Sequence, residues 1–243
     1  MSRFFVDSSD IGTEYININD KGDIKHMTKV LRLSVGDAVD ISDGVIWEYE
    51  TEISEISNEE VILKITDKQH FAREPEIEIC LYQGIPKAGK MGNIIQKSVE
   101  LGVKKIVPVF MDRTVVLDKG KFDKKIERWQ KVSSEAVKQC KRGIIPKVAI
   151  NVKFKDILPE LNEYDLVVFP YENENNRTIK DLLSENNPKS VAVIIGPEGG
   201  FSDNEAKSLI DNGILGVSLG KTILRTETAG PTAIAMIMYE YEI

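Results

Sequence analysis

The first seventy residues alternate apolar and polar positions in short runs. These runs are AVDISDG (38–44), IWEYETEISEI (46–56) and EVILKITDK (60–68), and Gly, Asp and Asn separate them. A period of two puts every second side chain on one face of a strand, and turn residues between the runs indicate consecutive short strands. One stretch of helical period, DIKHMTKVLR (23–32), lies among them. The pattern predicts a small β-barrel over residues 1–70.

The pattern changes after the acidic, Pro-containing stretch FAREPE (71–76), which we take as a linker. Strand-length apolar runs now alternate with amphipathic runs of helix length. The strand runs are IEICLYQG, KKIVPVFM, KVAINV, DLVVFPYE, SVAVIIG and ILGVSLG, and the helix runs are MGNIIQKSVELG, DKKIERWQKVSSEAVKQC, TIKDLLSEN, SDNEAKSLIDNG and TAIAMIMYEYEI. Such alternation is typical of a parallel sheet covered by helices. It predicts an α/β domain over residues 76–243.

Length and composition narrow the class of protein. A chain of 243 residues can bury a sizeable core in one large or two small domains. Its first residues, MSRFFVDSSD, contain no apolar segment, and the apolar run AIAMIM (233–238) is far too short to span a bilayer. We therefore expect a cytoplasmic protein with no membrane partner. The cysteines Cys80 and Cys140 and the histidines His26 and His70 are too few for a disulfide framework or a zinc site, so we expect no metal.

Charge is distributed unevenly along the chain. The net charge is −7, yet residues 86–147 carry 16 basic and 6 acidic side chains. Residues 1–85 carry 8 basic and 18 acidic side chains, and residues 148–243 carry 8 and 15. A basic segment in an acidic chain is typical of a surface that binds a phosphate backbone, although a solvated basic face gives the same count.

The stretch GIPKAGKM (84–91) follows a predicted strand and has the spacing G-x-x-x-x-G-K. A P-loop needs a hydroxyl after its lysine to hold the metal on the phosphates, and Met91 supplies none. A Walker-type site also needs an acidic residue at the end of a later strand, for which Asp112 is a weak candidate. We therefore expect Lys87 and Lys90 to contact the phosphates of a polynucleotide.

A glycine-rich loop, GPEGG (196–200), follows the apolar run VAVII. Ser202 and Glu205 have the Ser-x-x-Glu spacing of a capping box, which marks the start of a helix. Glycines let a backbone pass close to a ligand, and the loop differs from the dinucleotide fingerprint G-x-G-x-x-G. Considered alone, it is explained equally well as a tight strand-to-helix turn without a ligand.

A second loop, KTILRTETAG (221–230), follows the next predicted strand. Open α/β sheets bind ligands at the carboxyl ends of their strands, where both loops are expected. Arg225 and Glu227 lie in this loop, before a helix that we expect to start near Thr228. Such a pair is usually a surface ion pair, but beside a glycine-lined ligand site the two residues become candidates for chemistry.

The two loop sequences, IGPEGGFSDNE and LGKTILRTETA, closely resemble the C-terminal signatures of the bacterial 16S ribosomal RNA uridine N3-methyltransferases, members of the SPOUT class. Further matches are RFFVD, HMTKVLRLSVGDAVDISDG, GIPKAGKMGNIIQKSVELGV and SSEAVKQCKRGIIPKV. The resemblance implies a PUA-like RNA-binding β-barrel over residues 1–70. It also implies a SPOUT-type α/β parallel-sheet domain with a C-terminal trefoil knot over residues 76–243, a homodimer, and 16S rRNA as partner, as free RNA or within the small ribosomal subunit.

The resemblance also implies S-adenosyl-L-methionine as cofactor. Carried onto the matching positions, the cofactor is expected to lie against Pro170, Gly196, Glu198, Gly199, Leu219, Gly220, Ile223 and Leu224. The family's basic positions match Lys87, Arg113 and Arg142, for which RNA contact is the expected role. Arg3, His26 and Arg32 would extend this surface onto the first domain, although His26 is equally well explained as a structural residue. Thr222 departs from the family pattern, which has a basic residue there, and Lys221 precedes it.

The implied substrate sets the chemistry. A uridine N3 carries a proton, and the negative charge left by its removal spreads onto the flanking carbonyl oxygens. We expect Arg225 to stabilise this anion and Glu227 to help remove the proton; in the alternative, Glu227 only orients Arg225 through an ion pair. Because N3 lies on the Watson–Crick edge, the target must be unpaired or flipped outward.

Three other functions stay open at the level of sequence. A non-catalytic RNA-binding or assembly protein would explain the barrel and the basic segment, but not the two loops. A P-loop nucleotidase would require metal-dependent triphosphate binding. A ribose 2′-O-methyltransferase of the same class would use a similar cofactor site.

Overall fold

The structure is a computed structural model that describes residues 3–70, 74–87, 89–118, 120 and 122–243. The chain forms two compact units. Unit 1 consists of Met1–Glu74 together with Val137–Ile145, and unit 2 consists of Pro75–Ala136 and Pro146–Ile243. Half of the expected linker, residues 71–73, lies outside the described residues.

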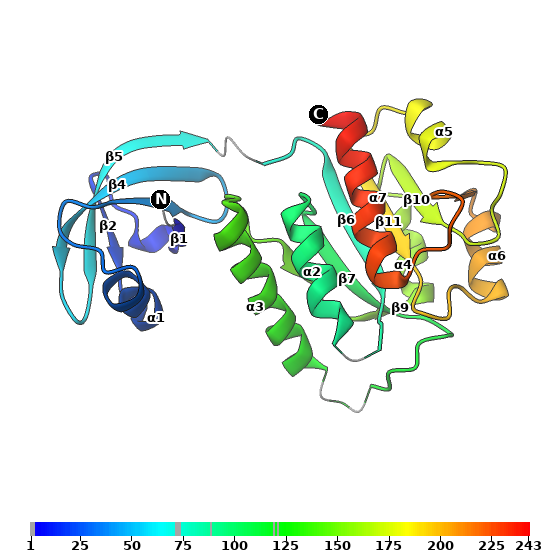
Figure 1. The fold of residues 1–243 in the computed structure, drawn as a ribbon, viewed down its shortest axis with the longest axis horizontal. Coiled ribbons are helices and arrows are strands. Elements are labelled where there is room, and N and C mark those ends of the chain that lie inside the picture. Colours follow the sequence, from blue (N-terminus) through cyan, green and yellow to red (C-terminus); the bar gives the residue numbers. More distant parts are fainter. Residues whose placement is uncertain (1–2, 71–73, 88, 119, 121) are drawn as a thin grey trace. The chain divides into compact units, whose positions relative to one another are not determined.

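Unit 1 is built on a five-stranded sheet in the order β1-β3-β4-β5-β2 (Figure 1). β1 pairs with β3 in parallel, and the other neighbours are antiparallel. The three predicted strand runs are confirmed as β3, β4 and β5, and the helical stretch as α1 with a π-helical turn after it. The elements are β1 (Arg3–Phe5), a 3₁₀ turn (Ser8–Asp10), β2 (Tyr15–Ile18), α1 (Lys21–Lys25), the π-helical turn (His26–Val30), β3 (Ala38–Ser42), β4 (Trp47–Ile56) and β5 (Val61–His70).

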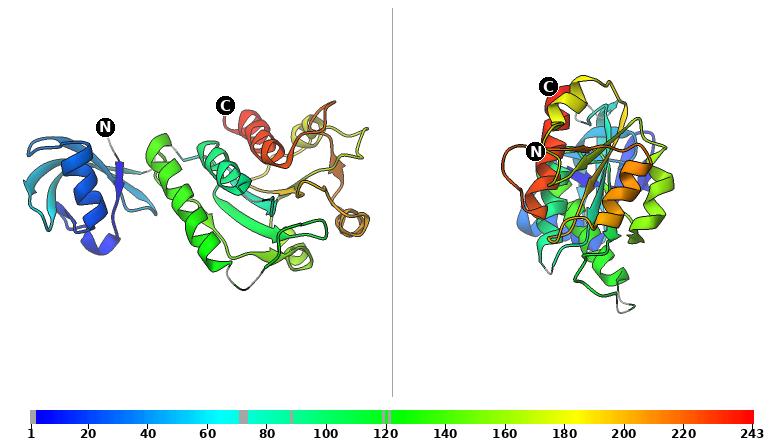
Figure 2. Two further views of the ribbon diagram at one scale, coloured as in Figure 1. Left: turned by 60° about the horizontal axis from the view of Figure 1, so that its bottom comes forward. Right: turned by 90° about the vertical axis from the view of Figure 1, so that its right-hand side faces the viewer.

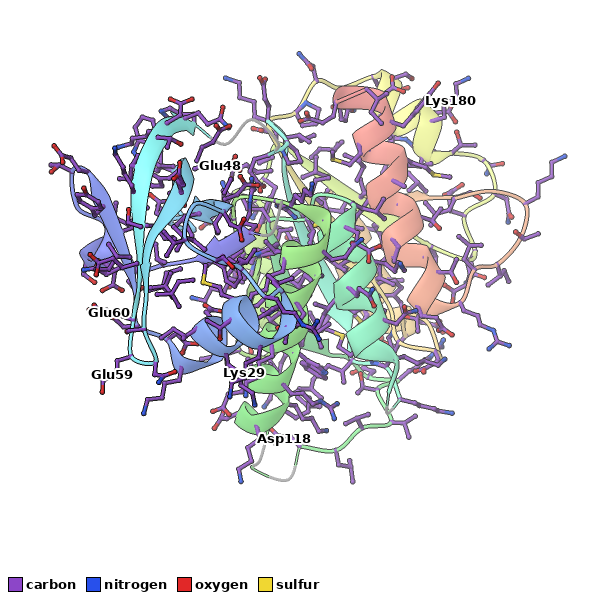
Figure 3. The ribbon with its side chains drawn as sticks, turned by 60° about the vertical axis from the view of Figure 1, so that its left-hand side comes forward. Lys29, Glu48, Glu59, Glu60, Asp118 and Lys180 are labelled. Atoms are coloured by element: carbon purple, nitrogen blue, oxygen red, sulfur yellow. The ribbon has the colours of Figure 1, made fainter. Side chains whose placement is uncertain are left out.

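The alternation in the sequence produces the core of unit 1. Every second residue of β2 is buried, as a period of two requires when one face of a sheet is covered. The turn between β4 and β5 lies at Glu59 and Glu60, whose backbone N–H groups donate to the Ser57 hydroxyl (Figure 3). The core is one apolar cluster made of Phe4, Ile16, Ile18, Ile24, Met27, Val39, Ile41, Tyr49, Ile53, Val61 and Leu63.

A segment from the middle of the chain completes unit 1. The Glu74 carboxylate accepts a hydrogen bond from the Arg142 guanidinium at 2.7 Å and two more from the backbone N–H groups after Arg142. Arg3 and Ser42 donate to backbone carbonyls of the same segment, each at 2.6 Å. The domain division predicted from the sequence placed residues 137–145 in the second domain. A helical pattern in the sequence gives no sign that a segment forms hydrogen bonds with residues far away in the chain.

Unit 2 is an α/β domain with a parallel sheet in the order β12-β10-β11-β6-β7-β8, and β9 pairs with the carboxyl end of β7 (Figures 1 and 2). This confirms the predicted sheet of parallel strands separated by helices. The strands are β6 (Glu78–Gly84), β7 (Lys105–Phe110), β8 (Lys147–Val148), β9 (Val152–Lys153), β10 (Leu166–Pro170), β11 (Ser190–Ile195) and β12 (Gly216–Val217). The helices are α2 (Lys90–Glu100), α3 (Asp123–Cys140), α4 (Phe154–Leu161), α5 (Ile179–Ser184), α6 (Asp203–Asp211) and α7 (Thr226–Tyr241). The end of α3, from Val137 on, belongs to unit 1.

Helices cover both faces of this sheet. α4 and α6 pack on one face, where Ile157 and Leu209 join a core cluster with Tyr82 and Phe169. α7 packs on the other face against β6, β10 and β11, and α2 lies beside α7 (Figures 1 and 2). Parallel strands end at a common edge, so the loops after β10, β11 and β12 are neighbours there. None of the helices in the described part of the chain combines the length and apolarity that crossing a membrane requires.

Candidate active site

A pocket of about 710 Å³ opens at the carboxyl edge of the sheet in unit 2. The loops after β10, β11 and β12 form its wall, together with Lys90 at the start of α2. Its volume falls within the roughly 300–1,000 Å³ typical of small-molecule sites. The structure therefore brings both loops singled out in the sequence to one concave site.

The loop 196–200 follows a path that requires glycine. The chain at Gly84 passes so close to this loop that a Cβ on Gly84 would lie 2.6 Å from the nitrogen of Pro197. Gly200 has φ +67°, and a Cβ there would collide with the carboxylate of Glu172. The backbone of the loop, and not its side chains, thus forms much of the pocket wall.

Side chains from neighbouring elements hold the loop in place. The predicted capping box is confirmed: the Ser202 hydroxyl accepts the backbone N–H of Glu205 at 3.2 Å, and the Glu205 carboxylate accepts that of Ser202 at 2.8 Å. The buried Glu205 carboxylate also accepts the N–H of Asp112 at 2.8 Å. Arg113 donates to the carbonyl oxygen of Gly199 at 2.9 Å. The loop after β7 and the glycine loop are therefore fixed to each other.

Thr226 joins the two loops of the pocket. Its hydroxyl donates to the carbonyl oxygen of Gly196 at 2.6 Å and accepts from Nε2 of Gln83 at 2.9 Å. Both Thr226 and Gln83 are buried. As the first residue of α7, Thr226 lies between Arg225 and Glu227, so this chain of hydrogen bonds holds the backbone from which both side chains extend.

Lys90 is paired with two carboxylates. Its Nζ lies 3.2 Å from Oε1 of Glu198 and 3.0 Å from Oε2 of Glu227. Hydrogen bonds to Glu227 and then to Glu198 raise the pKa of Lys90, which therefore stays protonated. The role of Lys90 as a phosphate contact stays a prediction, and the structure adds its two carboxylate partners.

The two carboxylates are ionised at neutral pH. The backbone N–H of Glu227 and then the Lys90 ammonium lower the pKa of the Glu227 carboxyl. Burial raises the pKa of Glu198, but hydrogen bonds from the backbone N–H groups of Glu198 and Lys87 and from Lys90 outweigh it, and the net shift is downward. The ion-pair partner of Glu227 among the described residues is Lys90, whereas Arg225 lies exposed in the pocket wall. The structure therefore lacks the Arg225–Glu227 ion pair on which the orienting role depends.

The residues expected to hold the cofactor lie together. All eight line the pocket: Pro170, Gly196, Glu198, Gly199, Leu219, Gly220, Ile223 and Leu224. The Glu198 side chain contacts residues 87 and 90. Its backbone is therefore the part of Glu198 that is available to the cofactor, as the resemblance implies. Sequence reasoning missed the acidic residues Glu172 and Glu174, which line the pocket and lie two and four residues after Pro170.

Two of the six residues expected to contact RNA are buried. The Arg3 guanidinium pairs with Glu48 at 2.6 Å, and that of Arg142 pairs with Glu74 at 2.7 Å. Both arginines are 5–6% exposed. The expectation of RNA contact is wrong for Arg3 and Arg142, because neither can present its charge to a phosphate without breaking a buried ion pair.

The other four have different surroundings. His26 is half-buried and contacts the ring of Phe4 edge-on, with centroids 5.7 Å apart, which fits the structural alternative. Arg32 and Lys87 are exposed. Arg113 is exposed too, but its guanidinium is bound to the glycine loop. Thr222 and Lys221 both line the pocket.

The pocket suits S-adenosylmethionine in size and chemistry. Apolar side chains such as Ile223, which is 83% exposed, can cover an adenine ring, and the glycine loop offers main-chain donors and acceptors. The carboxylates of Glu172 and Glu174 can pair with hydroxyl or ammonium groups. Among the described residues, no cluster of three His, Cys, Asp or Glu side chains has a geometry suited to a metal ion.

Comparison with known proteins identifies two family domains. Residues 73–238 match the family described as RNA methyltransferase domain, and residues 18–66 match the RNA methyltransferase PUA domain. The chain is 31% identical over 227 residues to the ribosomal RNA small subunit methyltransferase E of Bacillus subtilis. The alignment covers 91% of this chain and 89% of that protein.

Solved structures agree over the whole chain. A methyltransferase of Legionella pneumophila in complex with bound SAM has a TM-score of 0.84 and 30% identity, covering 98% of this chain and 96% of that one. The ribosomal RNA small subunit methyltransferase E of Neisseria gonorrhoeae bound to S-adenosyl methionine has a TM-score of 0.88 and 25% identity, covering 99% and 98%. These likenesses confirm the expected fold class, a SPOUT-type α/β domain preceded by a small β domain.

Proposed function

This chain belongs to the family of RNA methyltransferases that join a PUA domain to a methyltransferase domain, and we propose that it transfers a methyl group from S-adenosyl-L-methionine to N3 of a specific uridine in 16S rRNA. The observation that carries this proposal is one pocket lined by all eight residues expected for the cofactor and by Arg225. The Lys90–Glu227 ion pair lies at the same site.

The backbone of the glycine loop and of residues 219–224 would hold the cofactor. When bound, the cofactor would supply a sulfonium methyl group for transfer to N3, and the electron pair of the broken carbon–sulfur bond would leave with the sulfur. Holding the two reactants together would supply much of the acceleration. The chain's own task is then to bind the uracil, expose its N3 lone pair and keep water out.

Glu227 accepts the N3 proton in this proposal. It is ionised at neutral pH, its side chain is 21% exposed, and its ion-pair partner Lys90 lines the pocket, so Glu227 lies at the border of the pocket. Its lowered pKa makes it a weak base, so the anion formed on the uracil must be stabilised at once. Arg225, exposed in the pocket wall, provides a cation for that purpose.

The proposal includes the partners implied by the family. The substrate is 16S rRNA, free or within the small subunit, and unit 1 contributes RNA contacts as its PUA domain. Arg32, Lys87 and Arg113 are the exposed cations among the expected RNA contacts. We further propose a cytoplasmic homodimer; the exposed apolar ring of Tyr239 at the end of α7 is one residue that a second copy could cover.

The deciding experiment is methyl transfer from labelled S-adenosylmethionine to small ribosomal subunits of a strain that lacks this gene. The expected product is N3-methyluridine, identified by nucleoside analysis. A 2′-O-methyl nucleoside as product would support the proposed cofactor and contradict methylation at N3. Binding of RNA without binding of S-adenosylmethionine would instead favour a non-catalytic assembly protein.

A further inference from the structure

We propose that Lys90 is a catalytic residue: one N–H of its ammonium donates a hydrogen bond to a carbonyl oxygen of the target uracil and stabilises the anion formed when N3 loses its proton. The inference rests on the proposed function and deepens it, because it names a second cation for the reaction beside Arg225.

The hydrogen-bond donors of Lys90 are not all used. A lysine ammonium has three N–H donors. Two have carboxylate acceptors, Oε1 of Glu198 at 3.2 Å and Oε2 of Glu227 at 3.0 Å. The third has no acceptor among the described residues. The side chain of Lys90 is 31% exposed in the wall of the pocket, so this donor is available to a molecule bound there.

Lys90 is held in place before any substrate binds. It is the first residue of α2, after Gly89 with φ +93°. Glu198 accepts the backbone N–H of Lys87 at 3.1 Å, so the glycine loop is bound to the loop before α2 as well as to Lys90. Glu227 holds the ammonium from the first turn of α7. A cation fixed in advance stabilises developing charge without the cost of reorganisation.

The arrangement keeps a cation beside the negative charge while that charge moves. Glu198, Glu227 and Arg225 are the charged groups around Lys90 and Glu227. When Glu227 takes the proton, the N3–H bond breaks, its electron pair stays on the uracil, and Glu227 becomes neutral. One negative charge thus moves from Glu227 to the uracil, and Lys90 is beside it in both states. This lowers the cost of forming the anion.

Two lysines, Lys90 and Lys221, are among the residues that line the pocket. The side chain of Lys221 carries a charge but is exposed and has no fixed partner among the described residues. Lys90 is therefore the better-placed cation.

The test compares Lys90→Met and Lys90→Arg with wild type and with Lys97→Met. Lys97 is a matched control on the same helix, with a surface ion pair to Glu100 at 2.8 Å. Affinity for S-adenosylmethionine is measured by calorimetry without RNA. Single-turnover methyl transfer at saturating cofactor is measured from pH 4 to pH 9 with nucleoside analysis.

We expect Lys90→Met to bind the cofactor within about threefold of wild type and to lose about 10²–10³-fold in single-turnover rate, the range seen when one electrostatic donor is removed. Lys90→Arg should recover part of the rate, and Lys97→Met should behave as wild type. Without Lys90 the pKa of Glu227 rises, so the acidic limb of the rate profile should move to higher pH.

The outcomes separate the two proposals. A wild-type protein that makes no N3-methyluridine overturns the proposed function, and the role of Lys90 with it. An active wild type with an unchanged rate in Lys90→Met overturns the role of Lys90 alone. A loss of cofactor affinity as large as the loss of rate also overturns it, because Lys90 would then only tie the glycine loop to α2 and α7.

Discussion

The hydroxyl of Thr226 donates a hydrogen bond of 2.6 Å to the carbonyl oxygen of Gly196, 30 residues earlier in the chain. This bond connects the glycine loop to the start of α7, and Gln83 extends the connection to β6. One buried hydroxyl thereby fixes the loop assigned to the cofactor relative to the loop that carries the residues assigned to the chemistry.

Thr226→Val removes that hydroxyl and keeps the shape of the side chain. It leaves the Gly196 carbonyl and one N–H of the Gln83 amide buried without their hydroxyl partner, although Nε2 of Gln83 still donates to the carbonyl oxygen of Gly84. This costs about 1–3 kcal/mol of folding free energy. We expect this loss in urea unfolding, together with weaker binding of S-adenosylmethionine in calorimetry. Thr226→Ser should stay close to wild type. Equal affinities in all three proteins would show that the hydroxyl does not organise the pocket.

Arg142→Met should destabilise unit 1 and not act through RNA. Removing one partner of a buried ion pair leaves the Glu74 carboxylate uncompensated, at a cost of about 3–5 kcal/mol. Chemical unfolding measures the loss, and Arg32→Met, at an exposed site, should change stability by less than about 0.5 kcal/mol. If Arg142→Met unfolded like wild type and bound rRNA more weakly, the RNA role rejected above would be restored.

The two thiols should differ in reactivity. Burial raises the pKa of Cys80 to about 11, whereas Cys140 is partly exposed. Because the thiolate is the reactive form, a maleimide at pH 8 should label Cys140 and spare Cys80 in the folded protein, and label both in denaturant. Mass spectrometry of peptides reads the result. The folded state holds the Cys80 proton more tightly than the unfolded chain, so this residue makes stability fall as pH rises above its ordinary value of 9.0. Rapid labelling of native Cys80 would contradict its burial.

Acid should weaken the cluster around Lys90. The pKa values of Glu198 and Glu227 are lowered in the folded state, so their stabilisation is present above the ordinary value of 4.5 and is lost as pH falls through the lowered values. The double variant Glu198→Gln, Glu227→Gln should therefore show a smaller fall in Tm than wild type between pH 6 and pH 3. Glu185→Gln, which removes an exposed partner of Arg177, is the control and should follow wild type. A fall in the double variant as steep as in wild type would exclude this cluster as a source of acid sensitivity.

The features that sequence predicts here are local in the chain. The capping box of Ser202 and Glu205 and the strand runs β3 to β5 depend on residues close in sequence, and the structure confirms them. The helix α4 was missed because it is short and Pro159 lies inside it, so its pattern is weak.

The site chemistry depends on contacts that no local pattern shows. Lys90 and Glu227 are 137 residues apart, and their pairing follows from α2 and α7 lying side by side on one face of the sheet. Arg142 matches a basic position of the family, and only the fold shows that Glu74 neutralises it. The choice between an ion pair and an RNA contact is thus made by tertiary structure.

Unit 1 also has a consequence for how the protein is made on the ribosome. Residues up to Glu74 leave the exit tunnel well before the segment Val137–Ile145 that completes the unit. At a synthesis rate of roughly 5–20 residues per second, this interval lasts on the order of 4–14 seconds. During that time Arg3 and Ser42 have no carbonyl acceptors from the later segment. Unit 1 of the nascent chain therefore stays incomplete while most of the first half of unit 2 is translated.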